Sequence, residues 1–254
     1  MKIMTDILRS INKRLVKYCG LHISRHQEFP TDFADDHMDI IRLVKPYTMT
    51  SSEKLYALIQ GVKHIIQNNV PGDIVECGVW RGGSMMAVAH TLLKLNQKEK
   101  SLFLFDTFAG MSEPTEFDVN VHGLKASDKF IKKKRADGKS DWTFASLDEV
   151  KNNLLQTGYD ESKINFIAGK VEDTIPEKAP ESISLLRLDT DWYESTKHEL
   201  VHLFPRLSKN GVVIIDDYGL WKGSQKAVDE YFSENNINLL LNRVDHSARM
   251  GLKL

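Results

Sequence analysis

The stretch DIVECGVWRGGSMM, residues 73–86, decides the fold of this chain. It opens on a short apolar run, 74–77, that is typical of a buried strand, and it continues through a glycine-rich turn into a helix expected over 84–95. Glycine lets the backbone turn sharply and approach a ligand without a Cβ in the way. The stretch therefore predicts a strand–turn–helix unit with a ligand beyond the carboxyl end of the strand.

The same alternation of strand and helix continues to the end of the chain. The further strands are expected at 102–105, 164–167, 183–188, 212–215, 237–242 and 249–253. The helices are expected from Ser52 and over 146–156, 195–206 and 224–234. Apolar strands without strict alternation, separated by helices, are typical of a parallel sheet covered on both faces. The sequence thus predicts an α/β fold of the Rossmann type, with a doubly wound, mostly parallel sheet of seven strands.

Two segments stand outside this alternation. Residues 1–45 are expected to form an N-terminal helical cap or oligomer contact before the main domain, 46–254. Within the cap, 3–18 has an apolar face and a basic face, which favours packing on the main domain or a second subunit; a helix on a membrane surface is the alternative. The polar and charged stretch 109–141 is expected to be a lid insertion, because long insertions in compact domains are usually lids or mobile loops.

Composition narrows the class of protein. The 254 residues include 34 basic and 35 acidic side chains, so no basic excess favours a nucleic-acid partner. Cys19 and Cys77 give no disulfide framework, which indicates a reducing, cytoplasmic environment. Neither a membrane-spanning apolar run nor a secretion signal is expected.

The glycine turn favours a ligand other than a dinucleotide. Trp80 stands where the G-x-G-x-x-G pattern needs its second glycine. Glu76, before the first glycine, can attract the ammonium of a methionine moiety, and Asp106, at the end of the second strand, can accept hydrogen bonds from a ribose or serve as a turn residue. Glu172 and Asp173 follow the third strand, where they are either adenine contacts or an ordinary charge pair at a helix start.

Carboxylates follow two strands that we expect to be neighbours. Asp189 and Asp191 end one strand, and Asp216 and Asp217 end the next. Such charges are costly together unless something positive lies among them, and oxygen ligands suit Mg²⁺, Mn²⁺ or Ca²⁺ rather than zinc; helix caps and turns are the alternative role. A metal can acidify an alcohol as it acidifies bound water, and a carboxylate can take the proton before the alkoxide attacks a sulfonium methyl. These residues alone do not separate the roles of Asp189 and Asp191.

Several runs together resemble the macrocin O-methyltransferase family, whose members methylate sugar hydroxyls during macrolide and aminocoumarin antibiotic assembly. The resemblance covers about residues 46–254 and rests on the runs DIVECGVWRGGSMM, LFLFDTFAGM, VEDTIP, LLRLDTDWYEST and IIDDYG. It implies a Rossmann-like class I methyltransferase that uses S-adenosylmethionine and Mg²⁺, with Mn²⁺ as an alternative. It also implies a homo-oligomer in which the N-terminal segment helps to cover the active site.

The resemblance implies specific site residues. Asp189, Asp216 and Asp217 would bind the metal, and Asp191 would be the general base. The implied adenosylmethionine contacts are Tyr47, Thr48, Met49, Glu76, Gly78, Ser84, Asp106 and Asp173. The acceptor is expected to be a glycoside or another small hydroxyl compound. A catechol acceptor, a nicotinamide-dependent oxidoreductase on the same fold and an inactive binding protein are the alternatives.

Overall fold

The computed structural model describes residues 2–21, 28–137 and 139–254. The chain divides into two compact units, Met1–Phe33 and Ala34–Leu254. The first unit contains α1 (Lys2–Cys19), which matches the helix expected over 3–18. The second unit contains the sheet and also α2 (Asp35–Val44), which packs against α3 (Ser52–Gln67) and α4 (Gly83–Lys94). Residues 34–45 therefore belong to the body of the main domain.

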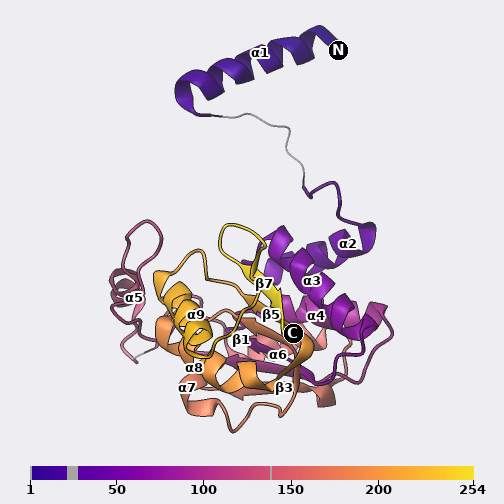
Figure 1. Cartoon of the computed structure of the whole chain (residues 1–254), viewed down its shortest axis with the longest axis vertical. Helices are drawn as coiled ribbons and strands as arrows, with labels where there is room; N and C mark the ends of the chain where they lie inside the picture. Colours follow the sequence, from indigo (N-terminus) through magenta and orange to yellow (C-terminus); the bar gives the residue numbers. More distant parts are fainter. Residues whose placement is uncertain (1, 22–27, 138) are drawn as a thin grey trace. The chain divides into compact units, whose positions relative to one another are not determined.

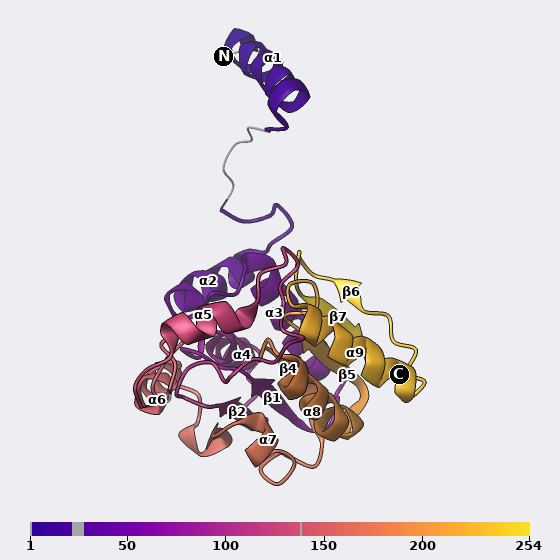
Figure 2. The same ribbon diagram turned by 90° about the vertical axis from the view of Figure 1, so that its left-hand side faces the viewer.

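The second unit is built on a seven-stranded sheet with the order β3-β2-β1-β4-β5-β7-β6 (Figures 1 and 2). The strands are β1 (Asp73–Cys77), β2 (Leu102–Asp106), β3 (Ile164–Ala168), β4 (Ile183–Leu188), β5 (Leu207–Ile215), β6 (Asn242–Arg243) and β7 (Arg249–Leu252). Strands β1 to β5 are parallel to one another, and β7 is antiparallel to both β5 and β6. The prediction of a Rossmann-like, mostly parallel sheet is confirmed.

Strand β1 lies at the point where the chain order of the sheet reverses. It pairs with β2 on one side, where Glu76 lies beside Leu104, and with β4 on the other, where Glu76 lies beside Arg187. In open α/β sheets, ligands bind beyond the carboxyl ends of the strands at such a switch point. The topology therefore places the site at the ends of β1, β2 and β4.

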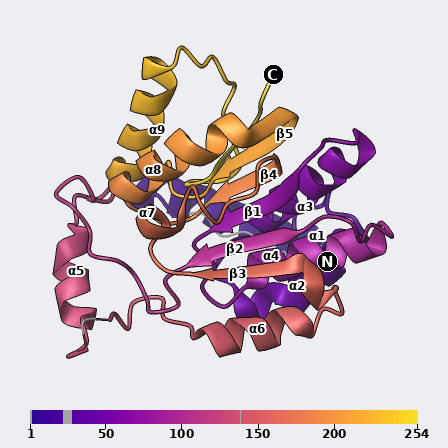
Figure 3. The same ribbon diagram turned by 90° about the horizontal axis from the view of Figure 1, so that it is seen from below.

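Helices cover both faces of the sheet. Figure 3 shows α7 (Val171–Thr174), α8 (Tyr193–Leu203) and α9 (Lys222–Glu234) on one face, and α2, α4 and α6 (Leu147–Leu155) on the other. Short 3₁₀ turns lie at Lys45–Tyr47, Glu161–Lys163 and Phe204–Arg206. Strand β4 is buried along its whole length, as expected for a strand with a helical layer on each face. No described helix is long and apolar enough to cross a membrane.

The strand expected over 237–242 is much shorter in the structure. Only Asn242 and Arg243 form β6. Ile237, Leu239 and Leu241 instead pack their side chains against the core cluster beside α8 and α9. The apolar run therefore reflects burial of these side chains rather than a ladder of main-chain hydrogen bonds.

The 109–141 insertion is docked on the main domain at its start. The carboxylate of Asp118, 1% exposed, accepts the Tyr193 N–H at 2.8 Å and the Thr115 N–H at 2.6 Å. The Trp192 indole donates to the Ser112 carbonyl at 3.1 Å.

Helix α5 (Ala126–Lys133) lies further along the insertion. Its Phe130 and Ala126 pack in a cluster with Trp142, Trp192 and Trp221. Whether this insertion moves as a lid stays a prediction.

Candidate active site

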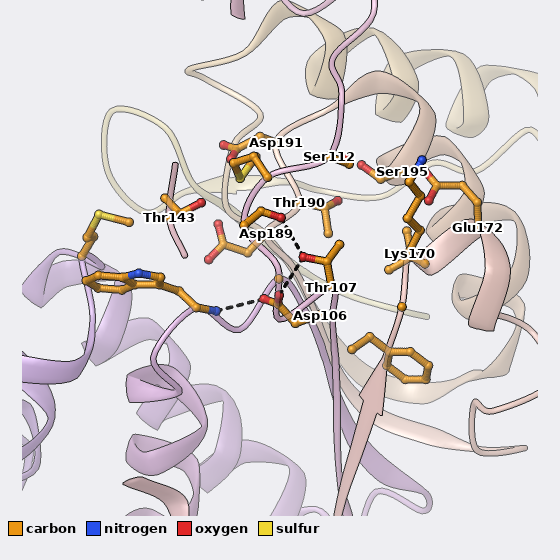
Figure 4. Close-up of a pocket in the computed structure, with 18 residues that line it drawn as sticks. Asp106, Thr107, Ser112, Thr143, Lys170, Glu172, Asp189, Thr190, Asp191 and Ser195 are labelled. Atoms are coloured by element: carbon orange, nitrogen blue, oxygen red, sulfur yellow. Dashed lines mark hydrogen bonds between the residues drawn. The ribbon is translucent and has the colours of Figure 1, made fainter. Parts of the chain in front are cut away.

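One cavity opens at the carboxyl ends of the parallel strands, as the topology requires (Figure 4). Its empty space is about 700 Å³, the open solvent at its mouth included. Its walls are formed by segments that follow β1 to β4, together with part of the insertion. The lining residues include Met49, Gly78, Trp80, Asp106, Thr107, Met111, Ser112, Thr143, Lys170, Glu172, Asp189, Thr190, Asp191 and Ser195.

Asp106 fixes the glycine turn on the cavity wall. Its Oδ2 accepts the main-chain N–H groups of Val79 at 2.7 Å and Trp80 at 3.0 Å, and its Oδ1 accepts that of Phe108 at 2.7 Å. Gly78 has φ +82°, and a Cβ there would lie 2.0 Å from the Asp189 carbonyl oxygen, so this position requires glycine. Asp106 is thus a turn residue in this structure, and a ribose contact from the same carboxylate stays a prediction.

Strained backbone concentrates at the cavity. Three lining residues without glycine's freedom have left-handed φ angles, Trp80 at +48°, Thr143 at +51° and Asp191 at +67°. Phe108, at +49°, follows the lining residue Thr107. Such angles are costly for bulky or β-branched residues and cluster at functional sites, because the surrounding structure must hold them in place. The other described non-glycine residues with positive φ are all asparagines, which tolerate this conformation.

Three carboxylates converge beside the cavity. Asp189, Asp216 and Asp217 each offer an oxygen, and these oxygens lie within 4.8 Å of one another. Asp216 and Asp217 are buried. The Asp191 main-chain N–H donates to Oδ2 of Asp217 at 3.2 Å, which ties the turn after β4 to the end of β5. The four aspartates that the sequence singled out therefore lie at one place.

Two cations lie among these carboxylates, and the sequence analysis missed both. Arg187, 2% exposed in β4, donates to Oε1 of Glu76 at 2.6 Å, to Oδ2 of Asp189 at 2.7 Å and to Oδ1 of Asp216 at 2.5 Å. Lys54, from α3, forms an ion pair with Oδ2 of Asp216. A signal for Arg187 was present, because a charged residue in a buried strand must have partners.

The cluster remains short of positive charge. Burial and, secondly, the neighbouring Asp189 carboxylate together raise the pKa of Asp191 to about 7. Burial likewise raises the pKa of Asp189 well above its usual range, against the pull of Arg187, and does the same at Asp217. A dication at this place would lower all three pKa values, so the donor set fits a hard divalent cation.

The implied cofactor residues occupy different places. Met49, Gly78 and Asp106 line the cavity. Tyr47, Thr48 and Ser84 lie behind the glycine turn; a Cβ at Gly83 would lie 2.7 Å from Tyr47 and Thr48 atoms. Ser84 is buried with its hydroxyl 3.4 Å from that of Thr50.

Two acidic residues assigned to the cofactor, Asp173 and Glu76, are not among the residues that line the cavity. Asp173 is exposed on α7, and its neighbour Glu172 lines the cavity instead. Glu76 is fully buried under the turn; its Oε2 has no hydrogen-bond partner among the described residues, and burial raises its pKa to about 7. Arg187 is the cation that pairs with this carboxylate, and Glu76 is not among the residues that line the cavity.

The comparisons with known proteins identify the family. A family model described as Macrocin-O-methyltransferase (TylF) matches residues 6–250. The chain belongs to this family. The O-methyltransferase is 32% identical over 191 residues to demethyldecarbamoylnovobiocin O-methyltransferase of Streptomyces niveus, covering 75% of this chain and 70% of the relative. It is also 30% identical over 202 residues to mycinamicin III 3''-O-methyltransferase of Micromonospora griseorubida, covering 80% and 76%.

Solved structures give the same assignment. The O-methyltransferase NovP superposes on this family member with a TM-score of 0.71 at 26% identity, over 99% of this chain and 98% of NovP. The calicheamicin methyltransferase CalS11 has a TM-score of 0.59 at 16% identity, over 91% and 99%, and supports the fold alone. The Rossmann-like fold and the O-methyltransferase activity predicted from the sequence are confirmed.

Proposed function

We propose that this O-methyltransferase transfers a methyl group from S-adenosylmethionine to a sugar hydroxyl of a glycosylated natural product, with Mg²⁺ bound by Asp189, Asp216 and Asp217. The observation that carries the proposal is the convergence of these three carboxylates beside Asp191, on the wall of the cavity that holds the glycine turn. The curated relatives, whose names describe O-methyltransferases of novobiocin, tetracenomycin and mycinamicin compounds, support the acceptor class. We further propose that the enzyme is a cytoplasmic homo-oligomer.

The donor fits the end of the cavity at the glycine turn. Asp106 and Gly78 line the space where a ribose and a methionine moiety would lie, and the buried Glu76, two residues before Gly78, attracts the ammonium of that moiety by its charge. Glu172, which lines the cavity after β3, competes with Asp173 for the adenine contact. Of the remaining assignments, Met49 lines the cavity and can contact the donor, whereas Tyr47 and Thr48 lie against Gly83 and the Ser84 hydroxyl lies 3.4 Å from that of Thr50.

The protein's own groups supply positioning and proton transfer. A bound Mg²⁺ supplies Lewis acidity toward the acceptor hydroxyl, as it does toward water. Asp191 accepts the hydroxyl proton, since its carboxylate lies on the cavity wall next to the triad. Lys54 and Arg187 hold Asp216 from both of its oxygens, so this ligand is oriented before any acceptor binds. The sulfur–methyl bond breaks as the oxygen–methyl bond forms, and adenosylhomocysteine leaves.

Metal removal is the first test. We expect EDTA to lower turnover about a hundredfold or more, because a Lewis acid contributes several kcal/mol to this kind of step, and Mg²⁺ or Mn²⁺ to restore it. Binding of adenosylhomocysteine, measured by calorimetry in EDTA, is the control for an intact fold. Full turnover after exhaustive chelation would remove the metal from the proposal.

The pH dependence follows from Asp191. We expect kcat/KM to rise with pH and to level off above about 7, because burial raises the pKa of this carboxyl to about 7 and only the ionised form can accept a proton. Positive charge at the triad lowers that pKa, so saturating Mg²⁺ should move the acidic limb to lower pH. Rate profiles at two Mg²⁺ concentrations measure the shift. A flat profile between about pH 5 and 9 would contradict the base assignment.

The acceptor class needs a direct screen. Methyl-labelled adenosylmethionine is offered with glycosides in one series and catechols in another, and transferred label is counted. We expect label on glycosides. Transfer confined to catechols would overturn the acceptor class while leaving the metal and the donor in place.

A further inference from the structure

A buried acid lies directly behind the active-site turn, and the mechanism above does not use it. Glu199, in the second turn of α8, is 0% exposed. Its Oε1 accepts the Thr190 hydroxyl at 2.9 Å, and its Oε2 has no hydrogen-bond partner among the described residues. Burial raises the pKa of this carboxyl well above its usual range. A buried acid with one oxygen unpartnered is costly, so a role is expected to compensate for it.

Glu199 reaches the turn because of helix geometry. Side chains in an α-helix lean toward its N-terminus, and α8 begins at Tyr193, just after the turn Asp189-Thr190-Asp191. Glu199 therefore points back along its own helix to Thr190. Thr190 lines the cavity between the proposed metal ligand Asp189 and the proposed base Asp191.

The turn itself is held in an unfavourable conformation. Asp191 has φ +67°, a left-handed angle that the chain must enforce. Main-chain bonds hold both ends, since the Asp189 N–H donates to the Cys77 carbonyl at 2.8 Å and the Trp192 N–H to the Thr190 carbonyl at 2.8 Å. The hydroxyl of Thr190 adds a side-chain tie from the middle of the turn to Glu199.

We propose that Glu199 is a positioning residue that holds the Asp189–Asp191 turn through the Thr190 hydroxyl, and so sets the relative placement of the metal ligand and the base. The proposal rests on the proposed function for its catalytic consequence, but the positioning itself is a property of the metal-free protein. Partners behind metal ligands commonly change metal affinity or activity about 10- to 100-fold. The same range is expected here.

The experiment uses the full-length chain and substitutions at both partners. Glu199→Leu and Thr190→Val each remove one partner while keeping volume similar, and Glu199→Gln and Thr190→Ser each preserve an acceptor or a hydroxyl. Glu194→Leu, on the exposed side of the same helix, is the matched control. Amide hydrogen exchange of the peptide covering 188–196 is measured without metal, Mn²⁺ affinity by calorimetry, and stability by urea unfolding.

We expect Glu199→Leu and Thr190→Val to speed exchange in that peptide about tenfold and to weaken Mn²⁺ binding 10- to 100-fold, as expected for loss of a supporting hydrogen bond. The double variant should be no worse than either single one, because both remove the same tie. Glu199→Gln, Thr190→Ser and Glu194→Leu should stay near wild type. If Glu199 contributed only to stability, the urea midpoint would fall in proportion to the faster exchange. If it positions the turn, exchange and Mn²⁺ affinity change even where the midpoint does not, because an apolar residue can replace a buried acid without loss of stability.

Wild-type exchange in Glu199→Leu and Thr190→Val would overturn the positioning role, whatever the metal result. Asp189→Asn tests the proposed metal site separately from the positioning role of Glu199. If it binds Mn²⁺ as wild type does, the metal site of the proposed function fails, while the exchange data still decide whether Glu199 holds the turn.

Discussion

Replacing Asp191 by asparagine is expected to lower kcat by about 10²- to 10⁴-fold, the contribution typical of a positioned general base. The amide has the same shape and keeps the main-chain N–H bond to Asp217, but it cannot accept the hydroxyl proton. Since Asp191 is a lining residue outside the three-oxygen cluster, affinity for Mn²⁺ should change much less than kcat. Single-turnover rates with saturating donor measure the chemical step directly.

The control for this variant is Asp148→Asn, an exposed aspartate at the start of α6, which should keep wild-type rates. Adenosylhomocysteine affinity in Asp191→Asn should stay within about threefold of wild type, because uniform binding does not use the base. Normal turnover in Asp191→Asn with a true acceptor would end the base assignment.

Replacing Arg187 by methionine is expected to destabilise the fold by about 3–5 kcal/mol, the cost typical of removing one partner from a buried ion pair. The guanidinium joins carboxylates from the ends of three strands: Glu76 in β1, Asp189 after β4 and Asp216 after β5. Without it, these acids would remain buried near one another with Lys54 as the nearest described cation of the cluster. Urea unfolding without metal measures the loss.

Arg81→Met is the matched control for Arg187→Met. Arg81 pairs with Glu149 at 2.6 Å, but both side chains are more than one-third exposed. Such pairs contribute about 0.2–1 kcal/mol, so this variant should unfold near the wild-type midpoint. Added Mg²⁺ should recover part of the stability of Arg187→Met, because a dication replaces some of the lost charge. Equal midpoints for the two variants would show that Arg187 is not the structural centre of the cluster.

The part of the site that the sequence predicted follows from the parallel sheet. Once 183–188 and 212–215 are recognised as neighbouring parallel strands, their carboxyl ends must share an edge. Asp189, Asp191, Asp216 and Asp217 then have to meet, and they do. The same logic placed Gly78 and Asp106 on the cavity wall.

The sequence analysis missed Lys54 and Glu199 because their contacts depend on geometry that strand order does not give. Lys54 reaches Asp216 across 162 positions, and this depends on how α3 is rotated over the sheet. Asp106 was expected to accept hydrogen bonds from a ribose or to serve as a turn residue, and its oxygens do fix the turn; spacing alone does not decide between the two roles. Glu199 looks like an ordinary helix residue until the turn before α8 is known in three dimensions.

The anchoring of the insertion could not be predicted either. Asp118 is one of many acidic residues in a charged stretch, and nothing in its neighbourhood marks it as buried. Its partner lies 75 positions away, at the first residue of α8. The three tryptophans of the cluster are likewise separated in sequence, and only the folded chain brings their rings within about 6 Å.

The Asp118 anchor restricts how this enzyme can be recombined with its relatives. Oδ1 of Asp118 lies so close to Gly223 that a Cβ at that position would stand 2.1 Å from it, and Met111 and Ser112 from the same segment form part of the cavity wall. A chimera that imports another enzyme's segment to redirect acceptor choice must therefore import the Asp118 carboxylate and retain glycine at 223. A segment without this carboxylate, or a host with a side chain at 223, would lose the anchor and with it the wall that the graft was meant to transplant.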